Sequence, residues 1–141
     1  MPIRTAEAEW KGNILKGEGV MKLGSGAFSG KYSVGSRFES NPGTNPEELI
    51  AAAHAGCFSM ALTAGMSRAG LTPTSVHTDA KAHIDKVGDG WSITKIELNT
   101  VGVVPGIDQA AFQQHAETAK AGCPVSKALT GTQITLTATL K

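Results

Sequence analysis

The sequence has no excess of charge of either sign and no long uninterrupted apolar run. It contains 13 Lys and Arg residues against 12 Asp and Glu, so the formal net charge is +1. A protein that binds nucleic acid through its phosphates needs a basic stripe, and this balance argues against that class. No apolar run reaches the roughly 18 residues of a membrane span, and residues 1–5 lack the apolar stretch of a secretory signal. We therefore expect a cytoplasmic protein whose partners include neither nucleic acid nor membrane.

Cysteine is also scarce, with only Cys57 and Cys123 in 141 residues. They form neither a C-x-x-C redox pair nor a zinc-knuckle pattern. Cytosolic thiols stay reduced unless their chemistry cycles, so two isolated cysteines could simply be small buried residues. The chain also lacks the G-x-G-x-x-G pattern of dinucleotide sites and the G-x-S-x-G elbow of serine hydrolases. The surroundings of the two thiols therefore decide between inert and reactive cysteines.

The apolar periodicity predicts strands, a long helix, a hairpin, a second helix and a final strand. No linker, repeat or low-complexity tract divides the chain, and its length is that of one domain. This order is typical of a single α+β domain over residues 1–141. The expected segments are strands at 6–10, after 17–19 and at 31–38, a helix at 46–69, a hairpin at 74–104, a helix at 107–121 and a strand at 134–140.

The long helix should begin with Asn45 as N-cap, Pro46 at N1 and Glu48 at N3, and end before Gly70. Its interior at residues 49–65 carries no formal charge and is mostly alanine and other small residues. A helix that is apolar on nearly all sides is normally buried. We therefore expect a buried helix.

Cys57 lies in the middle of this helix, where burial favours the neutral thiol. A cysteine that attacks a peroxide bond must be ionised, which requires a nearby cation that keeps its charge. Arg37 is the nearest arginine upstream, on the third expected strand with its side chain opposite that of Phe38. Glu47, in the first turn of the helix, is the candidate carboxylate that would orient Arg37.

Helix geometry separates these candidates. Glu47 and Cys57 are about ten residues apart, or roughly 15 Å along a straight helix. One guanidinium cannot easily touch both on an unbroken helix. Either the chain kinks between them or the site combines residues of two subunits; we prefer the second, which predicts a homodimer with composite sites.

Cys123 has the stronger local signal for reactivity. Pro124 suits the first position of a short helix, which leaves Cys123 as N-cap after Gly122, the expected glycine beyond the preceding helix. A helix start with Lys120 and Lys127 nearby would lower the pKa of its thiol. Residue chemistry alone therefore offers two reactive cysteines, leaves their roles open and leans slightly towards Cys123. The alternative for Cys123 is a small residue that fills a turn.

His54 lies three residues before Cys57 on the same helical face. It could act as a base or a ligand, although a packed histidine is the commoner case. A zinc site of His54, Cys57, Cys123 and His115 is conceivable, but nothing in the spacing supports it.

Two long segments resemble the signatures of the OsmC/Ohr family of organic hydroperoxide reductases, in particular its OsmC branch. The first is GTNPEELIAAAHAGCFSM at residues 43–60, and the second is KAGCPVS at 120–126. Similarity extends to residues 36–39 and 105–108 and covers essentially the whole chain. Gly56 stands where the family pattern leads us to expect alanine.

The resemblance implies an α+β fold with antiparallel sheets wrapped around a long buried central helix, in an intertwined homodimer. It implies that Cys57 attacks the peroxide, Cys123 resolves the product as a disulfide, and Arg37 and Glu47 hold the thiolate. It further implies an organic hydroperoxide as substrate, no metal, haem or nucleotide cofactor, and an external dithiol as reductant, supplied by dihydrolipoyl groups on carrier proteins. The corresponding role is defence against oxidative or osmotic stress.

Two other classes are considered beside this peroxidase. One is a non-enzymatic small-molecule-binding protein or stress-induced structural dimer with inert buried cysteines; the other is a thiol-dependent hydrolase or metal protein. For the peroxidase, an apolar wall formed by the alanine-rich helix with Phe28, Phe58 and Met60 would suit an alkyl or lipid peroxide.

Overall fold

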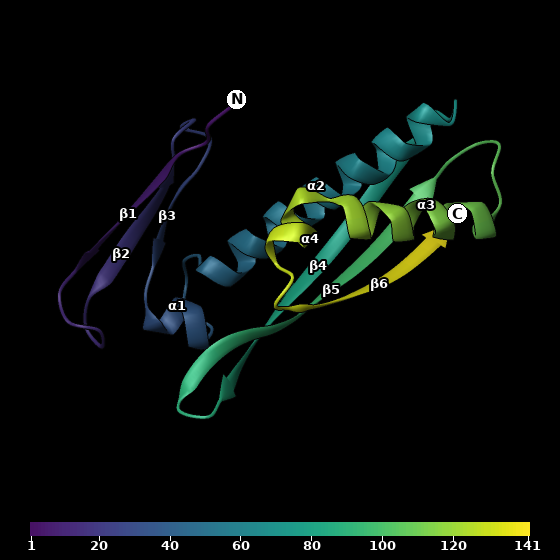
Figure 1. Ribbon diagram of the computed structural model, residues 1–141. Coiled ribbons are helices and arrows are strands. Elements are labelled where there is room, and N and C mark those ends of the chain that lie inside the picture. Colours follow the sequence, from purple (N-terminus) through teal and green to yellow (C-terminus); the bar gives the residue numbers. More distant parts are fainter. The chain divides into compact units, whose positions relative to one another are not determined.

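The computed structural model describes residues 1–141, with six strands and four helices in the order β1, β2, β3, α1, α2, β4, β5, α3, α4, β6 (Figure 1). The chain divides into two units, Met1–Leu49 and Ile50–Lys141, and each is described by itself. The expected alternation of strands and helices is present. The expectation of one domain over the whole chain stays a prediction.

The first unit contains an antiparallel three-stranded sheet in the order β1-β2-β3. β1 (Ala6–Lys11) pairs with β2 (Glu18–Leu23), and β2 pairs with β3 (Ser29–Tyr32). The short helix α1 (Val34–Phe38) follows. The first two strands lie where the sequence predicted them.

The prediction of one strand over residues 31–38 is wrong beyond Tyr32. Ser33 caps α1 instead: its hydroxyl accepts the N–H of Ser36 at 3.1 Å, and its own N–H donates to the Ser36 hydroxyl at 2.8 Å. Such local hydrogen bonds compete with a strand ladder. They turn the chain into a helix and place Arg37 on α1 rather than on a strand.

α2 (Pro46–Arg68) is a helix of 23 residues that starts as predicted. The side-chain oxygen of Asn45 accepts the N–H of Glu48 at 2.8 Å. Glu48 does not complete a capping box, since its carboxylate accepts from the Thr44 hydroxyl at 2.5 Å. Gly70 follows the helix with a φ of 82°, a conformation that glycine adopts without strain.

The second unit contains a mixed three-stranded sheet in the order β4-β5-β6. β4 (Ser75–Val87) and β5 (Gly90–Val103) form the expected antiparallel hairpin. β6 (Gln133–Leu140) pairs with β5 in parallel, so the expectation of antiparallel sheets is wrong for this strand. Two helices lie between β5 and β6 and return the chain to the end of the sheet at which a parallel strand must begin.

Those two helices are α3 (Gln109–Gly122) and α4 (Pro124–Ala128). Asp108 caps α3, and Cys123 is at once the C-cap of α3 and the N-cap of α4. Gly122 is therefore the last residue of α3, not the glycine beyond its end. The chain enters α4 directly, and Cys123 makes the turn with a negative φ of −59°.

The core of the second unit lies where α2 and α3 pack against one face of the sheet. Gly102 in β5 admits the ring of Phe112, because a Cβ there would stand 2.4 Å from it. The largest apolar side chains that are fully buried come from α2, α3 and β5: Phe58, Leu62, Met66, Phe112, Ile96 and Leu98.

α2 is buried along one stripe only, although it is apolar on nearly all sides. Its stripe includes Phe58 and Leu62, whereas Met60 is 77% exposed. The expectation of a fully buried helix is therefore wrong for the single chain. By length and composition α2 would also suffice to cross a membrane, contrary to the expectation that no apolar run is long enough. Core helices of soluble proteins pass the same test.

Candidate functional site

The two cysteines come together in the second unit, between α2 and the start of α4. Their sulfur atoms lie 2.6 Å apart, and both are free thiols. A disulfide bond measures about 2.05 Å, so oxidation requires the sulfurs to approach by roughly half an ångström. The structure thus places side by side the two thiols that the sequence singled out.

The buried stripe of α2 explains how Cys57 is presented. His54 and Phe58 are fully buried, and Cys57 lies at the edge of their stripe, half-buried. Cys123 is fully buried at the junction of α3 and α4. The pair therefore has one accessible sulfur, that of Cys57.

The pKa values of the two thiols shift in opposite directions. Burial raises the pKa of Cys57 and its hydrogen bond with Cys123 raises it further, opposed by the N–H of Val125. Burial acts on Cys123 in the same direction, but hydrogen bonds from Cys57, Ser126 and Val125 outweigh it and lower the pKa of Cys123. The hydrogen bonds that Cys123 receives favour Cys57 as the donor within the pair. Hydrogen bonding therefore favours the thiolate form of Cys123 over that of Cys57.

The start of α4 supplies these hydrogen bonds. Cys123 occupies the N-cap position that the sequence predicted, with Pro124 at N1. Its thiol makes no complete capping hydrogen bond, but the N–H groups of Val125 and Ser126 approach it closely enough to lower its pKa. Of the two expected lysines, Lys120 pairs with a glutamate of its own helix at 3.8 Å. Hydrogen bonds, rather than lysine charges, favour the thiolate.

His54 is fully buried beside this pair. Its Nε2 lies 2.8 Å from the hydroxyl oxygen of Ser126, and its Nδ1 has no hydrogen-bond partner. Burial lowers the pKa of His54, which keeps the ring neutral at physiological pH. Sequence reasoning treated His54 as a packed residue and missed Ser126, whose only signal was its place three residues after the N-cap.

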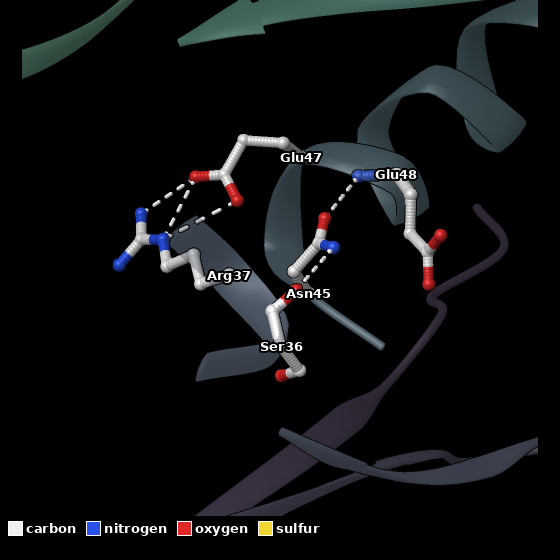
Figure 2. A network of polar contacts seen from close by, with 5 residues as sticks. All are labelled: Ser36, Arg37, Asn45, Glu47 and Glu48. Atoms are coloured by element: carbon white, nitrogen blue, oxygen red, sulfur yellow. Dashed lines mark hydrogen bonds and ion pairs between the residues drawn. The ribbon is translucent and has the colours of Figure 1, made fainter. Parts of the chain in front are cut away.

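In the first unit, the arginine and carboxylate chosen from the sequence form an ion pair (Figure 2). Nη2 of Arg37 lies 2.6 Å from Oε1 of Glu47, and Nε lies 3.0 and 3.3 Å from the two carboxylate oxygens. The side chain of Glu47 is 7% exposed and that of Arg37 is 38% exposed. A buried carboxylate thus fixes the plane of a partly exposed guanidinium.

Contacts at the junction of α1 and α2 position this ion pair. The Ser36 hydroxyl donates to the Thr44 carbonyl at 2.7 Å. The amide of Asn45 donates to the Ser36 carbonyl at 3.1 Å (Figure 2). The guanidinium lies 5.3 Å from the centre of the Phe38 ring. The prediction that Arg37 and Phe38 point to opposite faces of a strand is therefore wrong, and a cation–π contact replaces it.

One further expectation fails. Phe58 faces the core, so it cannot contribute to an apolar substrate wall as expected. No group of three or more His, Cys, Asp or Glu side chains is arranged to hold a metal ion, so the zinc set that was considered is not assembled.

Comparisons with known proteins give a consistent result. The family model described as OsmC-like protein matches residues 39–138. The chain is 48% identical over 139 residues to the peroxiredoxin OsmC of Escherichia coli strain K12, covering 98% of this chain and 96% of that protein. It is 38% identical over 97 residues to an organic hydroperoxide resistance protein of Xanthomonas axonopodis pv. citri, covering 67% and 66%. The crystal structure of an organic hydroperoxide resistance protein from Elizabethkingia anophelis superimposes with a TM-score of 0.77 at 25% identity, covering 99% of both chains.

Proposed function

Because this chain belongs to the OsmC-like family and is thereby a peroxidase-type oxidoreductase, we propose that it reduces organic hydroperoxides, with Cys57 as attacking and Cys123 as resolving thiol. The family and the α+β fold class that the sequence indicated are confirmed. The observation that carries the proposal is the pair of free thiols whose sulfurs lie 2.6 Å apart. Relatives named for peroxiredoxin activity and hydroperoxide resistance support the reaction class.

We infer different tasks for the two thiols from their exposure to solvent and from their pKa shifts. Cys57 is half-buried and Cys123 fully buried, so a hydroperoxide meets Cys57 first. Within the reduced pair, however, the pKa of Cys57 is raised by burial and by Cys123. Cys57 needs a cation to become the thiolate, and Cys123 can receive its proton across 2.6 Å.

We assign that cation to Arg37, held by Glu47. Glu47 and Cys57 are carried by the same helix, about ten residues or roughly 15 Å apart. We therefore propose that Arg37 of one subunit acts on Cys57 of the other in a homodimer. The apolar side of α2 that the single chain leaves uncovered, marked by Met60, is the surface that we assign to the partner subunit.

The reaction then runs in three balanced steps. The thiolate of Cys57 attacks the hydroperoxide, an S–O bond forms, the O–O bond breaks, and the alkoxide leaves under the charge of Arg37 and takes up a proton. The sulfur of Cys123 displaces hydroxide from the Cys57 sulfenic acid, which gives a disulfide and water. An external dithiol, for which we propose a dihydrolipoyl group on a carrier protein in the cytoplasm, reduces the disulfide by exchange.

Stoichiometric cumene hydroperoxide tests the proposal. We expect the reduced protein to lose both thiols as an intramolecular disulfide, measured by thiol titration and intact mass. Cys123→Ser should stop at an oxidised Cys57, and Cys57→Ser should keep its thiol. Thiols that persist in the unaltered protein would contradict the proposal and favour a binding protein with inert cysteines.

A further inference from the structure

Two parallel contacts join α2 to the segment that contains α4. The sulfurs of Cys57 and Cys123 lie 2.6 Å apart. The Nε2 atom of His54 lies 2.8 Å from the hydroxyl oxygen of Ser126. His54 precedes Cys57 by three residues, and Ser126 follows Cys123 by three residues. Because residues at this spacing lie on one face of a helix, the second contact links the same two segments about one helical turn from the sulfurs.

Ser126 attaches α4 to the rest of the second unit. α4 has five residues, and a helix of that length is not stable by itself, so tertiary contacts must hold it in place. Ser126 is the only buried residue of α4, and Leu129, which follows α4, packs against the core. Cys123 is also held by α3, where its N–H donates to the carbonyl of Ala119 at 2.9 Å. The approach of its sulfur to α2 therefore depends on how firmly α4 is attached.

His54 makes one hydrogen bond. Its ring is fully buried and its Nδ1 atom has no partner, so the contact with Ser126 is its single hydrogen bond whichever nitrogen carries the proton. A buried polar group that loses its partner destabilises the folded protein by more than one hydrogen bond adds to its stability. The protein therefore favours the arrangement in which Ser126, and α4 with it, lies against α2.

We propose that His54 and Ser126 are positioning residues for the thiol pair: their hydrogen bond holds α4 against α2 and raises the effective concentration of Cys123 at Cys57. The disulfide between the two cysteines is thereby stabilised. The place of this effect in a catalytic cycle rests on the proposed function, whereas the effect on the equilibrium between dithiol and disulfide does not.

In the proposed cycle the hydrogen bond acts on the resolving step. The sulfur of Cys123 attacks the sulfur of the Cys57 sulfenic acid, an S–S bond forms, the S–O bond breaks, and hydroxide leaves with the electron pair. Hydroxide takes up the proton of the Cys123 thiol, which gives water, and the oxidising equivalent is the one that the hydroperoxide delivered to Cys57. Because the attack needs the two sulfurs close together, a sulfur that is held beside Cys57 reacts faster than one that moves away.

Loss of the hydrogen bond should affect the two redox states unequally. In a reduced Ser126→Ala protein, α4 can move away from α2 and water can reach the imidazole of His54. In the oxidised protein the disulfide keeps α4 in place, and His54 stays buried without a partner. The substitution therefore destabilises the disulfide form more than the dithiol form, and the redox equilibrium shifts towards the dithiol.

The experiment measures this equilibrium without hydroperoxide, at neutral and at mildly acidic pH. The full-length protein is equilibrated with mixtures of reduced and oxidised glutathione, and its dithiol and disulfide forms are quantified by thiol alkylation and intact mass. Each protein disulfide that forms converts one glutathione disulfide into two glutathione thiols.

Ser126→Ala, His54→Phe and the double variant form a double-mutant cycle, which isolates the interaction between the two side chains. His54→Leu replaces His54→Phe in the cycle if the larger ring prevents folding. Ser126→Thr retains the hydroxyl and tests for rescue. Ser59→Ala is the matched control, because its partly buried hydroxyl bonds at 2.7 Å to Thr78 on β4 and not to α4.

With His54 present, we expect Ser126→Ala to shift the equilibrium constant towards the dithiol by about 3- to 10-fold, the effect of one buried hydrogen bond. A tenfold shift corresponds to about 30 mV for this two-electron couple. In the His54→Phe background the same substitution should change the constant by less than about twofold. Ser126→Thr should restore most of the parent value, and Ser59→Ala should match the parent. The melting temperature should fall more in oxidised than in reduced Ser126→Ala.

Three results would overturn the inference. The first is an unchanged equilibrium constant in Ser126→Ala, and the second is an equal shift with and without His54. The third is a shift at neutral pH that disappears at mildly acidic pH. A positioning contact acts at both pH values, whereas an effect on thiolate charge is lost once both thiols are protonated.

The outcomes also distinguish this inference from the proposed function. If cumene hydroperoxide oxidises both thiols but the double-mutant cycle shows no coupling, the peroxidase proposal stands and the positioning role fails. If the cycle shows coupling but the thiols do not react with cumene hydroperoxide, the proposed function fails and the positioning of the thiol pair stands.

Discussion

Replacement of Glu47 by glutamine tests whether the ion pair with Arg37 serves the thiol. Glutamine has nearly the same shape, but one carboxylate oxygen becomes an NH₂ group that confronts the Nε–H of Arg37. If Oε2 becomes the NH₂ group, the contact at 3.3 Å is lost, and Nη2 and Nε, at 2.6 and 3.0 Å from Oε1, donate to an acceptor that no longer carries a negative charge. A charge-assisted hydrogen bond contributes about 1.5–3 kcal/mol, and part of that is lost with the carboxylate charge. The hold on the guanidinium should weaken by about 1–2 kcal/mol.

Because about 1.4 kcal/mol corresponds to a tenfold change in rate, Glu47→Gln should slow the reaction of Cys57 with hydroperoxide by about 5- to 30-fold. The assay is the second-order rate of Cys57 oxidation in single turnover, measured with increasing cumene hydroperoxide. Glu48→Gln is the matched control, since this exposed neighbour in the same helical turn bonds to Thr44 and not to Arg37. It should react at the parent rate.

Two outcomes would refute this reasoning. If Glu47→Gln reacts at the parent rate while Arg37→Ala is slow, the carboxylate does not orient the cation. If both react at the parent rate, the ion pair serves only the junction of α1 and α2.

Further predictions concern the dimer, the helix and pH. Mixing Arg37→Ala subunits with Cys57→Ser subunits should restore activity in heterodimers; no recovery would contradict the site composed from two subunits. Gly56→Ala should stabilise the protein by about 0.5–1 kcal/mol, measured by denaturant unfolding, because a Cβ there meets nothing within 4 Å in the chain; destabilisation would mean that a partner lies against this position. The lowered pKa of His54 means that the folded state binds fewer protons, so its stabilising contribution is complete above the unfolded pKa of about 6.5 and is lost as pH falls towards the folded pKa. Below about pH 6.5, the denaturant midpoint of unfolding should therefore fall more steeply with decreasing pH in the parent than in His54→Phe. Equal slopes of midpoint against pH would argue against a buried neutral ring.

Local signals in the sequence predicted the elements that depend on them. Asn45 and Pro46 located the start of α2, and alternating residues located the hairpin of β4 and β5. The strand at residues 31–38 failed because Ser33 and Ser36 hydrogen-bond to each other's backbone, a choice that alternation does not reveal. The parallel pairing of β6 depends on the path of α3 and α4 and leaves no mark in the strand itself.

For the site, too, local signals were sufficient for some residues and contacts between distant residues were not predicted. Arg37 and Glu47 could be chosen by residue chemistry, because they lie within one short stretch of chain. The approach of Cys57 to Cys123 could not be derived from spacing and rested on the family motifs. Ser126 escaped notice because its partner His54 is 72 residues away in the sequence. Contacts of that range arise only when the folded chain brings α2 and α4 together.

Because the two sulfurs differ in burial, we expect the reductant to attack the disulfide at one sulfur and not at the other. In the disulfide, an incoming thiolate can reach the half-exposed sulfur of Cys57 but not that of Cys123. Exchange would therefore form a mixed disulfide on Cys57 and expel Cys123, whose hydrogen bonds make it the better leaving group. In the proposed cycle, the burial that would keep a hydroperoxide away from Cys123 would thus also determine which sulfur the reductant attacks.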